Sequence, residues 1–296
     1  MPCMKAFQPL FIAAIGIFLG SVMDALVKSA SAGTAIIAIA AWRYVFGSLY
    51  TGAAFVALKA QMPDRRGVAI HTLRGLCQVG VSLTFFWALS QLALAEATAL
   101  GFVATIMVAP LAQWTIGEKA GRWALPAALI GFVGVLIAIS ADTDGAPMDG
   151  ARLLGAGAAL LSALFFAASL ILLRLRAGCD DKAAVALFSN VVPALALLPL
   201  LPFAGPLPAL PELPFYALIG ALGVGLWVFL TFAYANAPAG RLAPLQYTGL
   251  IWSAVVGCLY FEELPGLRFF AGGAIIIGAC LMAGWRDEAE RRNADA

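Results

Sequence analysis

Apolar runs of about 20 residues recur from residue 7 to residue 285, and they constrain the fold of this chain more than any other feature. A helix of that length rises about 1.5 Å per residue and so crosses the ~30 Å hydrocarbon layer of a bilayer. Only 11% of the 296 residues are charged, whereas a soluble domain carries about 25%. The pattern therefore predicts an all-α integral membrane protein whose main partner is the lipid bilayer.

Charged residues, proline and glycine divide these runs into ten candidate transmembrane spans. We place them at 7–27, 34–58, 68–91, 96–116, 122–140, 152–173, 183–203, 213–236, 241–260 and 267–285. The third span begins weakly, because His71 and Arg74 interrupt its start. An acidic loop at 141–150 separates two halves, 1–140 and 151–286, and a polar tail at 287–296 follows the second half.

Positive residues set the expected orientation, because cytoplasmic loops of membrane proteins are enriched in Lys and Arg. With ten spans, fourteen Lys and Arg residues fall on the side of the N-terminus. Only Lys28, Arg152 and Arg268 fall in loops on the other side. The bias predicts a bacterial inner-membrane protein with both termini in the cytoplasm and the loop 141–150 in the periplasm.

The two halves carry similar sequences. Residues 85–118 align with residues 230–263, and each segment ends at an acidic residue that opens a loop. A repeat of five spans must insert upside down relative to its copy, because five is odd. Inverted repeats are typical of secondary transporters, which bind their substrate near the midplane between the halves. Chance similarity between two segments rich in Ala and Leu is the alternative.

Three segments resemble the EamA family of the drug/metabolite transporter superfamily: IGEKAGRWALPAALIGFVGVLI at 116–137, FEELPGLRFFAGGAIIIGACLM at 261–282, and AWRYVFGSL at 41–49. The resemblance implies ten helices in two inverted five-helix repeats around a central cavity. It also implies the export of amino acids, or the uptake of riboflavin or S-adenosylmethionine. Either Glu262 or Glu263 of the second copy matches Glu118.

Arg43 is the most informative side chain. It lies near the middle of the second span, where a guanidinium is costly and must face protein or water with a partner. Asp24 is one candidate for its counter-charge. A pair between Asp24 and Lys28, one helical turn apart, is the alternative. Asp24 and Glu96 are the acidic residues placed just inside the apolar slab, so they are the candidate proton carriers if transport is proton-coupled. Glu96 also suits a purely structural role in the first turn of a helix.

Other candidates for substrate binding are polar or aromatic residues within the spans. Amides at Gln78, Asn190 and Gln246 come from both halves and lie away from the span ends. They either line the cavity or form interhelical hydrogen bonds. Three aromatic residues are candidates for stacking on a planar solute: Trp87, Trp227 and Tyr247.

Several kinds of chemistry lack their sequence signatures. No GxxxxGK[ST], HExxH or GxSxG motif occurs, and His71 is the only histidine. We therefore expect no ATPase, no resident metal or cofactor, and no enzyme. A net charge of +2 gives no basic field for nucleic acid. A small-molecule substrate is the expected partner. A monomer suffices for this architecture, although a homodimer is compatible with it. The rival interpretation is a non-transporting membrane scaffold or an intramembrane enzyme.

Overall fold

The computed structural model describes residues 2–117, 124–139, 150–176, 178–205, 208–236, 246, 248–262, 266–275 and 277–279. These residues form helices joined by short connections, and no strand occurs among them. Five helical segments of the described chain are long and apolar enough to cross a membrane: Phe11–Ser31, Arg65–Gln91, Gly150–Arg176, Lys182–Phe203 and Leu210–Asn236. The prediction of an all-helical, multi-pass membrane protein is therefore confirmed.

Helical residues occur in each of the ten segments expected from the sequence. The elements are α1 (Pro2–Ser31), α2 (Ile36–Ala57), α3 (Arg65–Gln91), α4 (Leu94–Gly101), α5 (Val103–Ile116), α6 (Ala124–Ile139), α7 (Gly150–Arg176), α8 (Lys182–Leu197), η1 (Leu198–Phe203), η2 (Leu210–Glu212), α9 (Leu213–Asn236) and α11 (Thr248–Phe261). Residues 267–275 and 277–279 are also helical. The fourth expected span is divided into α4 and α5 at Phe102.

Local signals in the sequence explain where two of these helices begin. The Asp64 carboxylate accepts a hydrogen bond from Gly67 N at 2.7 Å and caps α3. Asp181 caps α8 in the same way, through Ala183 N at 2.9 Å. Such side chains satisfy backbone N–H groups that have no acceptor within the helix. Both caps therefore place the starts of α3 and α8 at the charged residues that flank the apolar runs.

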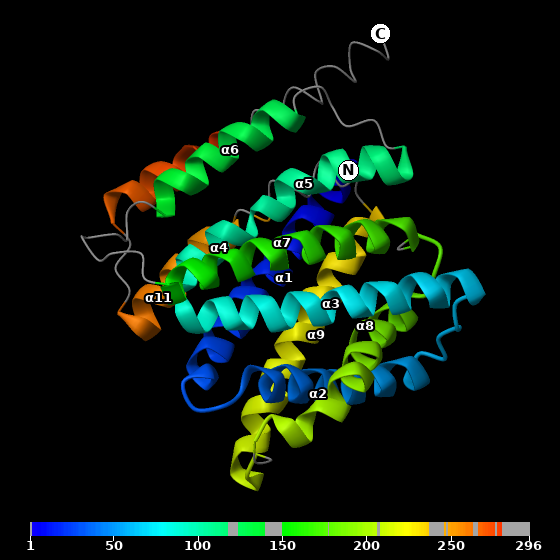
Figure 1. The fold of residues 1–296 in the computed structure, drawn as a ribbon. Coiled ribbons are helices and arrows are strands. Elements are labelled where there is room, and N and C mark those ends of the chain that lie inside the picture. Colours follow the sequence, from blue (N-terminus) through cyan, green and yellow to red (C-terminus); the bar gives the residue numbers. More distant parts are fainter. Residues whose placement is uncertain are drawn as a thin grey trace.

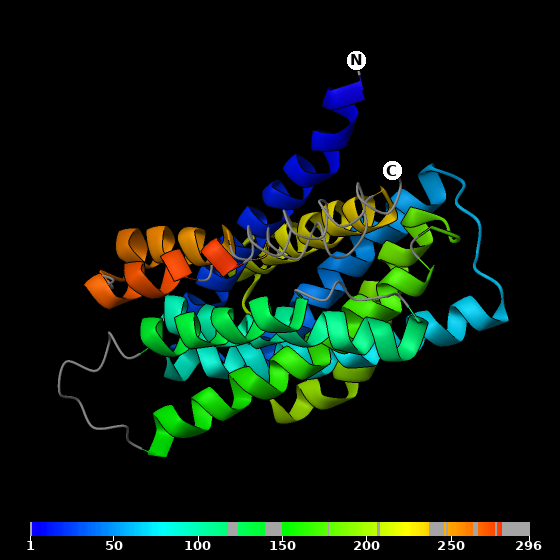
Figure 2. The same ribbon diagram turned by 90° about the horizontal axis from the view of Figure 1, so that it is seen from above.

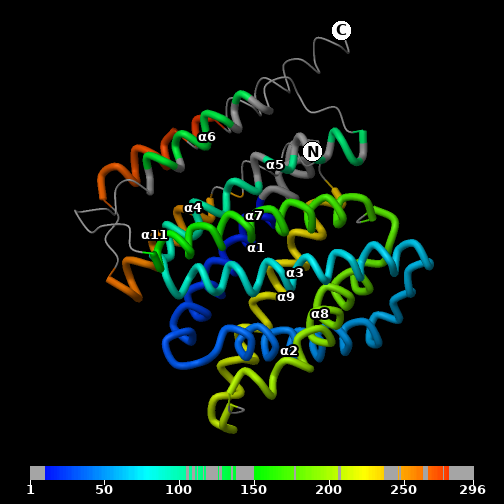
Figure 3. The backbone as a smooth tube through the Cα atoms, in the orientation of Figure 1, coloured from blue at the N-terminus to red at the C-terminus, as the bar shows by residue number. Residues whose placement is uncertain are grey.

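The helices pack in two layers. Helices α3 and α7 lie side by side in one layer, and α1 and α9 form the second layer behind them (Figures 1 and 2). Helix α2 packs against α8 and α9, and α3 also packs against α8. Helix α6 lies at the edge of the bundle opposite α2 (Figure 1). The tube in Figure 3 follows the chain through these helices and shows the connection from α2 to α3 running outside one end of the bundle.

Helix α3 buries its polar face. His71, Arg74, Gln78 and Ser82 are buried, whereas Leu73 on the opposite face is 52% exposed. A helix of a soluble protein does the reverse and turns its apolar stripe inward. In a bilayer the apolar face is covered by lipid, so polar side chains must find partners inside the bundle. The weak start of the third expected span thus reflects a polar interior face.

Several predictions lie on residues outside the described ranges. These are Glu118, Glu263, all of the loop 141–150 except Gly150, and the tail 287–296. Glu262 lies at the end of α11 with a φ of 54°. The boundaries of the two repeats and the orientation of the termini accordingly stay predictions.

Candidate functional site

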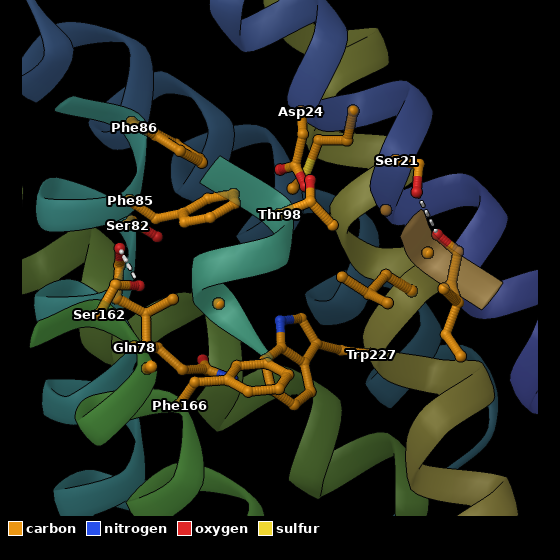
Figure 4. Close-up of a pocket in the computed structure, with 18 of the residues that line it drawn as sticks. Ser21, Asp24, Gln78, Ser82, Phe85, Phe86, Thr98, Ser162, Phe166 and Trp227 are labelled. Carbon is orange, nitrogen blue, oxygen red and sulfur yellow. Dashed lines mark hydrogen bonds between the residues drawn. The ribbon is translucent and has the colours of Figure 1, made fainter. Parts of the chain in front are cut away.

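A cavity opens at the centre of the bundle, between helices of both halves of the chain. It encloses about 940 Å³ of space free of protein atoms, including its opening to solvent. Its walls come from α1, α2, α3, α4, α7, α9 and the start of α11 (Figure 4). The polar and charged lining residues are Ser21, Asp24, Arg43, Tyr44, Gln78, Ser82, Thr98, Ser162 and Gln246. Most of the other lining residues are apolar, with Phe85, Phe86, Phe166 and Trp227 contributing aromatic rings.

Arg43 lies on the cavity wall and is 3% exposed. Its Nε donates to Met23 Sδ at 3.2 Å, and its Nη1 donates to Ser82 Oγ at 3.4 Å. The guanidinium carbon lies 4.3 Å from the centre of the Tyr44 ring and 6.0 Å from that of Phe86. Aromatic faces attract cations. The buried arginine is thus held by neutral groups, and it forms no salt bridge with any described carboxylate.

Asp24 also lines the cavity, and neither expected pairing occurs. Among the described residues, Asp24 forms no salt bridge with Arg43 or Lys28 and accepts no side-chain hydrogen bond. Lys28 instead donates to the Leu92 carbonyl at 2.8 Å and lies 5.2 Å from the centre of the Phe261 ring. Both pairing hypotheses are therefore wrong as direct contacts, although Asp24 and Arg43 do face one cavity.

The expected aromatic residues divide between the cavity and the outside. Trp227 is 5% exposed and lines the cavity, with its ring centre 5.9 Å from that of Phe166. Trp87 is 37% exposed and does not line the cavity, so its proposed stacking role is not supported by its position. On the same helix, Phe85 and Phe86 face the cavity instead (Figure 4).

Gln78 connects the cavity to a buried arginine that the sequence did not single out as functional. When its amide is oriented so that both the nitrogen and the oxygen have hydrogen-bond partners, Gln78 donates to the Ser189 carbonyl at 2.7 Å and accepts from Arg74 Nη2 at 3.2 Å. Arg74 is 0% exposed, and its Nη1 donates to Ser189 Oγ. Its guanidinium carbon lies 4.7 Å from the centre of the Trp227 ring. Arg74 therefore supports two lining residues from behind.

The other two expected amides differ in position. Gln246 lines the cavity. Asn190 is buried between α8 and α2 and donates to its own helix at the Ala186 carbonyl, 2.9 Å away. It packs against Gly47 and does not line the cavity, so it contributes to helix packing rather than to solute contact. Tyr247 lies outside the described residues.

Glu96 is engaged in an ion pair. It lies in the first turn of α4, and its Oε2 accepts from Arg152 Nη2 of α7 at 3.2 Å. The Glu96 side chain is buried, while Arg152 is partly exposed. The pair joins the first half of the chain to the second, which favours the structural interpretation of Glu96 that the sequence left open.

A second charged network joins the halves where α3 begins. Arg176 donates through Nε and Nη2 to Asp180 at 2.7 and 2.6 Å, and through Nη2 to Asp64 at 2.7 Å. His71 Nε2 lies 2.8 Å from Asp180 Oδ2. Burial raises the pKa of the Asp180 carboxyl, but the hydrogen bonds from Arg176 and His71 outweigh it and hold the pKa below its ordinary value.

The described side chains around the cavity form neither a catalytic centre of a known type nor a metal site. In the part of the chain that the structure describes, no three His, Cys, Asp or Glu side chains gather to hold a metal ion. The cavity instead combines a buried cation, a carboxylate that pairs with no described residue, amides and aromatic rings. Such a lining binds and orients an organic solute.

Comparison with known proteins agrees with this arrangement. Residues 153–285 match the EamA-like transporter family. A protein of Helicobacter pylori named as an uncharacterized transporter is 32% identical over 207 residues, which cover 68% of each chain. The pseudopaline exporter CntI of Pseudomonas aeruginosa is 28% identical over 278 residues, which cover 91% of this chain and 93% of the exporter. A solved crystal structure has the same fold, with a TM-score of 0.73 at 20% identity, over 93% of this chain and 96% of the other.

The multi-pass helical bundle surrounds a cavity of the size of a small solute, and its relatives are named as transporters. The protein is therefore a membrane transporter of metabolites and not an enzyme. The chain belongs to the EamA-like transporter family. The expectation of a non-enzyme and the resemblance to the EamA family are both confirmed, and the family match includes the segment at 261–282.

Proposed function

We propose that this protein is a secondary transporter that moves a small organic metabolite across the bacterial inner membrane by alternating access. The observation that carries the proposal is the central cavity, whose walls come from α1 to α4 of the first half and from α7, α9 and α11 of the second. A cavity shared between two halves can open to either side when the halves rock against each other.

The packing of the helices supports an arrangement of two inverted five-helix repeats. If α1, α2 and α3 correspond to α7, α8 and α9, the contact between α1 and α9 has its counterpart in that between α7 and α3. The contact between α2 and α9 likewise corresponds to that between α8 and α3, and the contact of α5 with α7 corresponds to that of α11 with α1. A pseudo-two-fold axis relating the halves would produce such matched pairs. We infer that both termini lie in the cytoplasm.

The substrate is amino-acid-like or vitamin- or nucleoside-like. Gln78 and Gln246 offer amide groups, and Trp227 offers a ring face for a planar or apolar part of the solute. The relative CntI carries the name of a pseudopaline exporter. Export and uptake both use a cavity of this kind. We therefore propose the class of substrate and not the direction of transport.

Asp24 is the better of the two candidate proton carriers. Its carboxylate lines the cavity and pairs with no described residue, whereas Glu96 is paired with Arg152. If transport is coupled to protons, Asp24→Asn should abolish the pH dependence of flux, and Glu96→Gln should retain it. Flux in proteoliposomes at a series of external pH values measures this. Unchanged pH dependence in Asp24→Asn would remove Asp24 from the coupling mechanism.

The experiment that tests transport has two stages. Thermal unfolding of the purified protein is followed with amino acids, S-adenosylmethionine, riboflavin and nucleosides, because a ligand of the folded state raises its apparent stability. Solutes that raise the stability are then tested for flux into proteoliposomes that contain the protein. Solute-specific flux that empty liposomes lack is the expected result. A protein that binds none of them and supports no flux of them would be the scaffold of the rival interpretation.

A further inference from the structure

Arg43 presents hydrogen-bond donors that no described residue uses. A guanidinium has five N–H donors, and only two are engaged, with Met23 Sδ and Ser82 Oγ. The rings of Tyr44 and Phe86 attract the cation but leave its remaining donors in the guanidinium plane without an acceptor. Because a buried charge without a partner is costly, the free donors of Arg43 define a subsite for an anionic group in the cavity.

Asp24 supplies the opposite charge at the same end of the cavity. It is the neighbour of Met23, whose sulfur contacts Arg43, and its carboxylate lines the cavity (Figure 4). In the described ranges it has no ion pair and no hydrogen bond. Lys28, one turn further along α1, is directed to the Leu92 carbonyl instead. The Asp24 carboxylate therefore defines a subsite for a cationic group beside the anion subsite.

Aromatic rings line another part of the cavity. Figure 4 shows Phe166 and Trp227 at the opposite end of the view from Asp24, with Phe85 on the wall between them. The Phe166 and Trp227 rings are inclined at 49° to each other. Rings arranged in this way offer apolar faces to a flat or bulky hydrocarbon group. The cavity thus has one end lined by side chains of both charges and an aromatic end whose own lining residues are uncharged.

We propose, on the basis of the transport function proposed above, that the substrate is an organic zwitterion with the charge pattern of an α-amino acid. Its carboxylate binds Arg43, its ammonium group binds Asp24, and its planar or apolar body lies against Phe85, Phe166 and Trp227. A neutral solute such as riboflavin or a nucleoside would leave both charges of the cavity unpaired. Amino acids and S-adenosylmethionine both carry the required pair of charges.

The test uses three probes that share a phenyl ring and differ only in charge. L-Phenylalanine carries both charges, phenethylamine lacks the carboxylate, and 3-phenylpropionate lacks the amine. Binding of each to the purified full-length protein is measured by calorimetric titration, and L-methionine and S-adenosylmethionine are included as zwitterions without a phenyl ring. The wild type should bind the zwitterion at least about tenfold more tightly than either singly charged probe, because each lost contact is a charge-assisted hydrogen bond.

Two variants separate the subsites. Asp24→Asn should remove the preference for phenylalanine over 3-phenylpropionate and keep the preference over phenethylamine. Arg43→Gln should do the reverse. If Arg43→Gln does not fold, Gly223→Ala takes its place, because a Cβ at Gly223 would lie 2.7 Å from Arg43 Nε and displace the guanidinium. Trp87→Ala, which changes an outward-facing residue, is the control and should bind all probes as the wild type does.

The outcomes distinguish this inference from the transport function on which it rests. Variants that weaken all three phenyl probes equally, or a wild type without preference for any zwitterion, would overturn the zwitterion site. Flux of riboflavin or a nucleoside without binding of any zwitterion would overturn it as well, while leaving the transport function intact. Loss of all solute-specific flux would instead refute the transport function.

Discussion

Alanine substitutions at two glycines one turn apart on α9 should distinguish a loss of solute binding from a loss of stability. Gly223 lies against the side chain of Arg43, and Gly220 lies against the backbone of α2. An added Cβ at Gly223 would lie 2.7 Å from Arg43 Nε and 2.9 Å from Nη2. Since heavy atoms in contact stay about 3.5 Å apart, the guanidinium of Arg43 must move by about 0.8 Å in Gly223→Ala.

That movement should weaken the binding of an anionic group and leave the stability of the fold nearly unchanged. The hydrogen bonds of Arg43 to Met23 and Ser82 are already long, at 3.2 and 3.4 Å, so the displaced guanidinium loses its alignment. Losing one hydrogen bond of a charged donor costs about 1.5–3 kcal/mol, which corresponds to about a 10- to 150-fold weaker affinity for an anionic group. The free energy of unfolding should change by less than about 1 kcal/mol, because the obstructing atoms end a flexible side chain and alanine favours the helix.

Gly220→Ala should show the opposite behaviour. Its added Cβ would lie 2.9 Å from the Arg43 carbonyl oxygen, 2.9 Å from Phe46 Cβ and 3.2 Å from Gly47 N. These atoms are fixed in α2, so the contact between α2 and α9 must open, and overpacking of this kind costs about 1–3 kcal/mol of stability.

The assay compares thermal unfolding with titration by L-phenylalanine for both variants in one detergent. Gly157→Ala is the control, because no described atom other than the adjacent backbone of α7 and the two neighbouring residues lies within 4 Å of the added Cβ. Wild-type affinity of Gly223→Ala for the zwitterion, or a wild-type unfolding temperature of Gly220→Ala, would refute this prediction.

Three further predictions concern packing and charge. Gly47→Ala should lower the free energy of unfolding by about 1–3 kcal/mol, because its Cβ would overlap the Asn190 amide, and adding Asn190→Ala should restore much of the loss on thermal unfolding. Because the folded pKa of Asp180 is depressed, its contribution to stability is present above about pH 4 and is lost as the pH falls through the folded pKa; an Asp180→Asn variant with unchanged acid sensitivity would contradict this. A double-mutant cycle on Glu96 and Arg152 should give a coupling energy of about 0.5–1 kcal/mol, and independent effects of the two changes would argue against the ion pair.

The apolar runs alone locate the helices of this chain, because the cost of leaving backbone polar groups unpaired in hydrocarbon allows little else. They do not locate the face that each helix turns inward. Trp87 was expected in the cavity and faces outward, although Phe86 and Ala88 on either side of it are buried. Successive residues of a helix point about 100° apart, so an error of one position exchanges the lipid face for the interior.

Arg74 belongs to a sequence pattern that could have predicted the interior face of α3. It is one of the fourteen positive residues counted on the side of the N-terminus, and it is 0% exposed within α3. His71, Arg74, Gln78 and Ser82 are spaced by three, four and four residues, which is the spacing of one helical face. A polar stripe on an otherwise apolar span indicates an interior face, because polar groups avoid lipid. The sequence could not predict that Arg43 contacts Met23 and Ser82, or that Asp24 pairs with no described residue, since a side chain's contacts depend on how neighbouring helices are rotated.

That stripe also links the cavity to the charged network at the Asp64 end of α3. Gln78 lines the cavity, Arg74 lies behind it against Trp227, and His71 contacts Asp180 one turn further on. Under alternating access, opening the cavity toward this end requires the halves to separate, which means breaking the contacts of Arg176 with Asp64 across the halves. The Glu96–Arg152 pair must break for the opposite end to open. The relative strength of these two charged contacts should therefore bias which end of the cavity is closed at rest.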